Sequence, residues 1–128
     1  MKKLLLGIAA VCLAGFTFAQ DAPLWMRHSV ISPDGTTIAF TYKGDIYTVP
    51  VAGGRAMQIT TNPAYDTAPV WSPDSKRIAF ASDRMGSLDV YIVAKDGGEP
   101  RRLTTHSGSE TPLAFTDAGH VLFSAGIM

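Results

Sequence analysis

Cysteine, net charge and long apolar runs are what this sequence has least of, and each shortage excludes a class of protein. The 128-residue chain holds one cysteine, Cys12, which excludes an internal disulfide framework and a cysteine-rich zinc site. Its 11 basic and 11 acidic residues balance, so no overall charge attracts it to nucleic acid or to an anionic membrane. Apolar residues make up 46% of the chain, which excludes a disordered protein.

The longest uncharged stretch lies at the N-terminus, over residues 4–18. It follows two lysines, Lys2 and Lys3, and ends at Ala19 with small residues in the cleavage positions. This order is typical of a secretory signal peptide. We therefore expect residues 1–19 to be removed near Ala19 and the remainder to be exported to the periplasm or secreted.

Two other interpretations of this N-terminal segment are weaker. A membrane anchor needs about 20 apolar residues to span a bilayer, and this stretch is shorter. Lipidation of Cys12 would require a small residue before it, whereas Val11 stands there and the cysteine lies inside the apolar run. We expect no stable membrane anchor.

Beyond the N-terminal segment the sequence repeats itself. The segment ISPDGTTIAF at 31–40 aligns with WSPDSKRIAF at 71–80, at an offset of 40. Later segments align at an offset of 44, so the second copy carries an insertion. The later pairs are 44–47 with 88–91, 53–54 with 97–98, and 59–61 with 103–105, and a third copy begins over 115–123.

A unit of 40–45 residues matches one four-stranded blade of a β-propeller. Short runs of β-branched and aromatic residues alternate with turn signals, and no segment shows the 3.6-residue period of a helix. We therefore predict an all-β chain: an incomplete β-propeller of about two and a half four-stranded blades after the signal peptide. Within residues 20–128, the blades are expected at about 23–61, 62–105 and, incomplete, 106–128.

The Ile-Ala-Phe strands are apolar on both faces, as expected for strands packed between neighbouring blades. Alternation places Ala39 and Ala79 towards one neighbour, where their small size leaves room. Their flanking residues then fill the opposite gap; these are Ile38, Phe40, Ile78 and Phe80. The Asp-Ile-Tyr and Asp-Val-Tyr strands are expected further out in each blade.

The second copy, PVWSPDSKRIAFASDRMGSLDVYIVAKDGGEPRRLT at 69–104, resembles the Trp-Ser-Pro-Asp repeats of the TolB-like propeller families. The opening segment PLWMRHSVISPDGTTIAFTYKGDIYTVPVAGG at 23–54 resembles the first blade of tricorn-like peptidases. This resemblance implies the N-terminal propeller of a longer, exported serine peptidase. The complete propeller would bind or gate peptide or protein substrates, with catalysis in a C-terminal domain, and the parent protein could form an oligomer.

Two other kinds of protein that contain similar repeats are alternatives for the longer protein. One is a TolB-like periplasmic propeller that binds protein partners without catalysis. The other is the propeller of a prolyl oligopeptidase-like enzyme, which would continue into an α/β-hydrolase domain with a G-x-S-x-G motif. The sequence downstream of residue 128 distinguishes these three possibilities.

The nearest approach to serine-nucleophile chemistry is the segment His106-Ser107-Gly108-Ser109-Glu110. It follows the last strand of the second blade, so an inter-blade connection is the better interpretation, and no G-x-S-x-G elbow is present. We predict no catalytic residue in this chain. Ser82-Asp83-Arg84 is expected to form a local ion pair or to cap the longer hairpin of the second blade.

No metal or cofactor site is predicted. The three histidines fall in different blades, and the aspartates that recur at one position of the repeat are expected in turns; these residues are His28, His106 and His120, and Asp34, Asp74 and Asp117. The Gly53-Gly54 and Gly97-Gly98 pairs recur between strands rather than before a helix, so they do not predict a phosphate site. The basic pairs Lys76-Arg77 and Arg101-Arg102 are expected on solvated surface, so no nucleic-acid partner is predicted.

Overall fold

The computed structural model describes residues 25–126, which form two four-stranded antiparallel sheets followed by a two-stranded hairpin. The predicted signal peptide lies outside the described residues. No described helix is long and apolar enough to cross a membrane. The first sheet contains β1 (Met26–Ile31), β2 (Thr37–Tyr42), β3 (Asp45–Pro50) and β4 (Met57–Gln58), the second contains β5 (Asp66–Trp71), β6 (Arg77–Met85), β7 (Ser87–Ala94) and β8 (Arg101–Arg102), and the hairpin contains β9 (Glu110–Asp117) and β10 (His120–Ala125).

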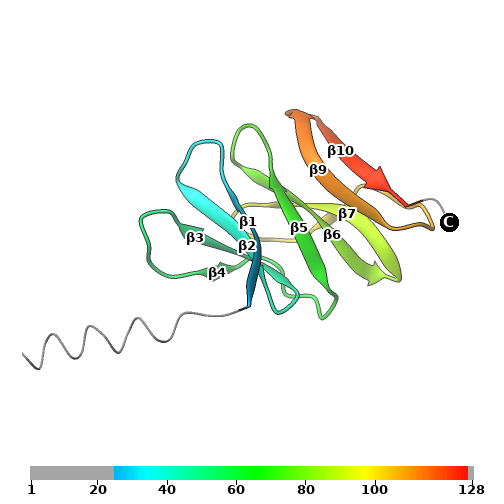
Figure 1. Cartoon of the computed structure of the whole chain (residues 1–128), viewed down its shortest axis with the longest axis horizontal. Coiled ribbons are helices and arrows are strands. Elements are labelled where there is room, and N and C mark those ends of the chain that lie inside the picture. The colour runs from blue at the N-terminus through cyan, green and yellow to red at the C-terminus, as the bar shows by residue number, and fades with distance from the viewer. Residues whose placement is uncertain (1–24, 127–128) are drawn as a thin grey trace, which may run out of the picture.

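Each sheet is a simple meander in which neighbouring strands follow one another in sequence. The three units succeed one another across the molecule, from β3 and β4 at one side to β9 and β10 near the C-terminus (Figure 1). Contacts between units run mainly through β1, β5 and β9, the first strand of each unit. The prediction of an all-β, incomplete propeller of four-stranded blades is confirmed.

The Ser-Pro-Asp motif builds the turn that follows the first strand of each sheet. Gly35 N–H donates to the carbonyl of Ser32 at 2.8 Å, and the Ser32 hydroxyl donates to Asp34 at 2.6 Å. The second sheet repeats this turn with Ser75 in place of Gly35, and both residues have a positive φ, of 61° and 74°. The aspartate at this position is therefore a turn residue, as the sequence predicts.

The two sheets pack face to face around the strands that the repeat identified. Ala39 lies in one buried cluster with Ile78 and Phe80 of the second sheet. This confirms the prediction that the small side chain of Ala39 leaves room for the neighbouring sheet. Trp71 Nε1–H crosses the interface and donates to the carbonyl of Val30 at 3.0 Å. The interface thus combines apolar packing with an indole hydrogen bond that fixes the position of β5 against β1.

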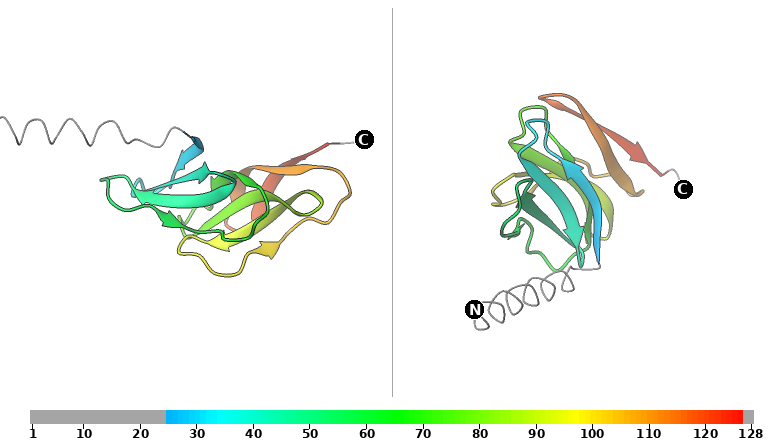
Figure 2. Two further views of the ribbon diagram at one scale, coloured as in Figure 1. Left: turned by 90° about the horizontal axis from the view of Figure 1, so that it is seen from below. Right: turned by 60° about the vertical axis from the view of Figure 1, so that its left-hand side comes forward.

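The outer face of the first sheet has no such neighbour among residues 25–126. The rings of Phe40 and Tyr47 stack there with centroids 5.8 Å apart, as do Phe80 and Tyr91 at the equivalent place in the second sheet. Whereas the Phe80–Tyr91 pair faces the first sheet, the Phe40–Tyr47 pair lines an apolar cavity of about 440 Å³. At the opposite side of the molecule, the β9–β10 hairpin ends the stack (Figure 2), and Leu122 of β10 is half exposed. Both ends of the stack therefore present surface suited to a further sheet.

Candidate functional site

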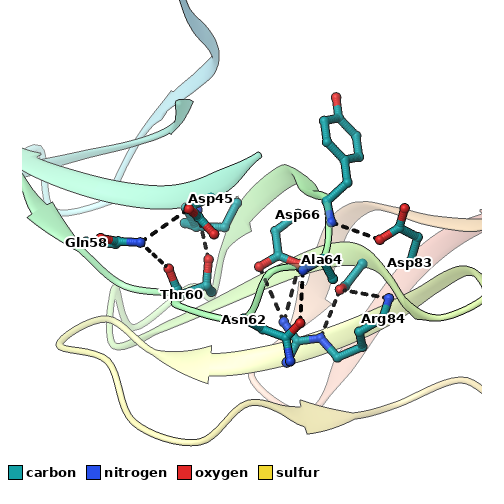
Figure 3. A network of polar contacts seen from close by, with 11 residues as sticks. Asp45, Gln58, Thr60, Asn62, Ala64, Asp66, Asp83 and Arg84 are labelled. Carbon is teal, nitrogen blue, oxygen red and sulfur yellow. Dashed lines mark hydrogen bonds and ion pairs between the residues drawn. The ribbon is translucent and has the colours of Figure 1, made fainter. Parts of the chain in front are cut away.

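One end of the two sheets gathers a set of polar side chains, drawn in Figure 3. Here the β2–β3 turn and the β6–β7 turn meet residues 59–65, which lead from the first sheet to the second. Asp66 N–H donates to the carbonyl of Gly44 at 2.8 Å, and Asp83 N–H donates to that of Tyr65 at 3.3 Å. We call this region the connection end; backbone hydrogen bonds between turns hold it together.

A buried ion pair at the connection end joins Asp66 to Arg84. Asp66 begins β5 and its side chain is fully buried, while Arg84 comes from the insertion that lengthens the β6–β7 hairpin. An Arg84 Nη2 atom lies 3.3 Å from each Asp66 oxygen, and Nε donates to the Ser82 hydroxyl at 2.9 Å. The guanidinium also lies 4.5 Å from the ring centroid of Tyr91, which adds a cation–π contact.

Asp45, at the start of β3, forms the neighbouring part of this network. Gln58 donates through Nε2 to Asp45 at 3.2 Å and to the carbonyl of Thr60 at 3.0 Å, and the Thr60 hydroxyl accepts the N–H of Ile46 at 2.9 Å. Burial raises the pKa of Asp45, and the negative charge of Asp66 raises it further. The two carboxylates are therefore held near each other at some cost to folding.

This cost predicts a pH-dependent effect of Asp45→Asn. A carboxyl whose pKa is raised above its usual 3.8 on folding disfavours the folded state once it ionises, so its contribution to stability is complete at low pH and is lost as the pH rises through the folded pKa. We expect Asp45→Asn to raise the urea midpoint at about pH 7 and to have less effect near pH 3. Asp96→Asn, at an exposed turn of the opposite end, is the matched control. A larger gain at low pH would contradict the assignment.

The second sheet has an acidic residue at the same position as the first, but its partner is an arginine instead of a glutamine. Asp89 is buried at the position equivalent to Asp45, and Arg102, at the position of Gln58, lies with Nη2 2.7 Å from Asp89 Oδ2. Glu110 begins β9 as Asp66 begins β5, and it is 2% exposed. His106 Nδ1 lies 3.8 Å from Glu110 Oε1. A buried carboxylate therefore starts the first strand of both following units.

A separate cavity of about 350 Å³ opens at the connection end between the first sheet and residues 59–65. Two exposed aromatic side chains, Trp25 and Tyr65, and two basic residues, Arg27 and Lys43, line it. Thr41 and Gly44 complete the lining. The cavity thus combines aromatic surface with positive charge.

The segment considered for nucleophilic catalysis lies where the sequence places it, in the connection from β8 to β9. His106 Nδ1 accepts the N–H of Gly108 at 3.1 Å, and within residues 25–126 neither Ser107 nor Ser109 receives a hydrogen bond from His106. Both serines are exposed, while Gly108 is buried against Gly126. The geometry is that of a turn in a connection between sheets.

The three histidines are separated, as predicted. His28 lies on β1, His106 in the β8–β9 connection, and His120 on β10 with Nδ1 2.8 Å from Asp117. No group of three or more metal-ligating side chains occurs among the residues that the structure describes. Hydrogen bonds from His120 and from Gly119 N–H hold the pKa of Asp117 below its usual 3.8, as expected of an aspartate in a turn.

Two interpretations of the charged residues need correction. Of the two roles expected for 82–84, the local ion pair is wrong, because Arg84 pairs with Asp66 and the Asp83 carboxylate accepts the N–H of Tyr65 at 2.8 Å. The hairpin cap is present, since Gly86 N–H donates to the carbonyl of Asp83 at 2.9 Å and the Ser82 hydroxyl accepts the N–H of Arg84. Arg102, expected on solvated surface, neutralises the buried Asp89. The offset of 44 aligns Asp45 with Asp89 and Asp66 with Glu110, but it does not show which basic residue each of them meets.

Arg77, another of the four basic residues expected on solvated surface, also forms a hydrogen bond within the chain. It is half-buried, and its guanidinium donates to the carbonyl of Ala118 in the β9–β10 turn. Its neighbour Lys76 is exposed, as predicted. The contact of Arg77 links the second sheet to the hairpin at the end opposite the connection end.

Four-stranded meanders stacked face to face, with their first strands in contact, define blades of a β-propeller. Within that class, residues 23–126 match the family model described as the tricorn protease N-terminal beta propeller domain, and the chain belongs to this family. It is 35% identical over 102 residues to tricorn protease homolog 1 of Streptomyces coelicolor, covering 79% of this chain and 9% of that protein.

A second relative is the uncharacterized peptidase YuxL of Bacillus subtilis, which is 30% identical over 129 residues, covering 99% of this chain and 20% of that protein. The chain thus spans a fifth or less of the length of these two relatives. Among solved structures, TolB from Acinetobacter baumannii matches with a TM-score of 0.68 at 23% identity, over 78% of this chain and 26% of that one. That likeness supports the fold.

Proposed function

We propose that this chain is the substrate-handling propeller region of an exported tricorn-like serine peptidase, which binds peptides and delivers them to a catalytic domain elsewhere in the parent protein. The observation that carries the proposal is the family match over residues 23–126 together with the identity to a tricorn protease homolog. The region's own contribution is a rigid stack of sheets that positions loops at the connection end. Export follows from the predicted signal peptide at residues 1–19.

The connection end supports this role because it offers both a rigid frame and accessible surface. The buried Asp66–Arg84 pair and the backbone hydrogen bonds between turns fix the loops. Next to them, Trp25 and Tyr65 present exposed aromatic surface of the kind that binds extended peptides. Catalysis is assigned elsewhere because Ser107 and Ser109 lack a geometry that would activate them.

The test is to titrate the full chain with short unstructured peptides by calorimetry and then recover the peptides by mass spectrometry. We expect saturable binding and intact peptides, because the chain binds but does not cleave. Absence of peptide binding would contradict the proposal, as would binding restricted to folded proteins, which fits a TolB-like docking role. Cleavage that disappears in the variant carrying Ser107→Ala and Ser109→Ala would place catalysis in this chain and contradict the assignment.

A further inference from the structure

We propose that the cavity lined by Trp25, Arg27, Lys43 and Tyr65 binds acidic peptide segments. The carboxylate of an Asp or Glu side chain lies between the two basic residues of this site. An apolar neighbour of that acidic residue packs on the two aromatic rings. This inference rests on the proposed function and specifies the class of peptide that the region selects.

The register of the first sheet separates this cavity from the face that a further blade would cover. Paired residues on neighbouring antiparallel strands point to the same side of a sheet. Arg27 pairs with Thr41, and both line this cavity, whereas Met26 pairs with Tyr42, and both line the apolar cavity on the opposite face. The site therefore lies on the side where the second sheet already packs, and a further blade on the open face of the first sheet leaves it accessible.

The two basic residues of the site are not paired with carboxylates. Neither Arg27 nor Lys43 forms an ion pair within residues 25–126. Lys43 Nζ lies 5.3 Å from the ring centroid of Tyr42, a weak contact that an exposed lysine can exchange for a carboxylate. Asp66 is paired with Arg84, while Asp45 and Asp83 keep their charge and accept hydrogen bonds from Gln58 and from the N–H of Tyr65. Two basic residues beside an exposed aromatic surface favour a ligand that carries a carboxylate next to an apolar group.

Lys43 occupies a position where a lysine is unfavourable for the fold. It is the first residue of the two-residue β2–β3 turn, with a φ of 50°, and Gly44 follows with a φ of 83°. Turns with two positive φ values prefer Asn-Gly, because asparagine tolerates this conformation better than residues with long side chains. If the ammonium group of Lys43 binds a ligand, a lysine is expected at this turn even though asparagine would suit the turn better.

The turn also supplies a variant that separates binding from folding. Lys43→Asn removes the charge and improves the turn, so we expect an unchanged or higher urea midpoint together with weaker binding of acidic peptide. Arg27→Gln removes the second charge. Lys76→Asn is the matched control, because Lys76 is an exposed lysine at the opposite end of the sheets.

The binding test uses two peptides with acetylated N-termini and amidated C-termini, Ala-Phe-Glu-Leu-Ala and its Gln counterpart, titrated into the full chain while tryptophan emission is followed. Trp25 is exposed at the site, whereas Trp71, the second tryptophan, is buried between the sheets. We expect the Glu peptide to bind about fivefold more tightly, with the preference falling as salt is added. Lys43→Asn and Arg27→Gln should each reduce this preference, whereas Lys76→Asn should not.

Equal affinities of the unmodified chain for the two peptides would overturn the acidic preference while leaving peptide binding, and so the proposed function, intact. Failure of both peptides to bind would overturn both. A Gln peptide with a free C-terminus that binds as tightly as the amidated Glu peptide would overturn the side-chain assignment and place a terminal carboxylate in the site. Retention of the full preference in both Lys43→Asn and Arg27→Gln would show that the site lies elsewhere.

Discussion

Phe80→Ala is expected to destabilise the protein by about 4 kcal/mol, because it removes a fully buried ring from the interface between two sheets. Phe80 stacks on Tyr91 and lies in one cluster with Ala39, Ile78 and Trp71. Sheets on both sides prevent the space from closing, so the cost of the cavity adds to the lost apolar burial. Urea unfolding followed by circular dichroism measures the change.

The repeat supplies a matched control for this variant, since Phe40 holds the same position in the first sheet. Its ring borders the open cavity of about 440 Å³, and water can enter when the ring is removed. We expect Phe40→Ala to cost about half as much, roughly 2 kcal/mol. Equal losses for the two variants at several protein concentrations would show that the Phe40 face is covered in solution and would contradict the open end of the stack.

Arg84→Ala is expected to cost about 3–5 kcal/mol, because it leaves the carboxylate of Asp66 buried without a counter-charge. The variant also removes the cation–π contact with Tyr91. Arg101→Ala, at an exposed arginine of β8, is the matched control and should change stability by less than about 0.5 kcal/mol.

A double-mutant cycle distinguishes the pair from the packing of the arginine chain. When Asp66 is first replaced by Asn, the further change Arg84→Ala should cost about 2 kcal/mol less than it does in the unmodified chain. Additive effects of the two substitutions would mean that Arg84 stabilises the hairpin through its contacts with the aromatic rings alone.

Much of the fold could be predicted because the sequence contains two copies of the same repeat. The Ile-Ala-Phe strands, the Ser-Pro-Asp turns and the role of Ala39 all follow from comparing 31–40 with 71–80. A strand period of two residues then assigns the faces.

The bulges were not predictable in this way. Residues His28 and Ala68 have φ values of 51° and 53° and shift the register of β1 against β2 and of β5 against β6. Neither position carries the glycine that commonly marks such a bulge. The alternation of faces in β1, and with it the placement of Arg27, therefore depended on the structure.

The polar pairs of the connection end were also missed, for a related reason. Arg84 and Asp66 are 18 residues apart and meet only because the lengthened β6–β7 hairpin folds back over the start of β5. Sequence proximity instead favoured Asp83 as the partner. Long-range ion pairs depend on register and on the course of a hairpin, which local patterns do not specify.

Hydrogen exchange of the backbone amides in the full chain tests the central claim most directly, namely that repeated sheets stack face to face and that, within residues 25–126, only the second sheet has a neighbour on both faces. Amides deep in a structure exchange only on large-scale opening, whereas those of a terminal element exchange by local opening. The account predicts the slowest exchange in β6 and β7, which have neighbours on both faces, intermediate exchange in β2 and β3, and the fastest in β9 and β10. Protection in β9 and β10 equal to that in β6 and β7 would contradict it.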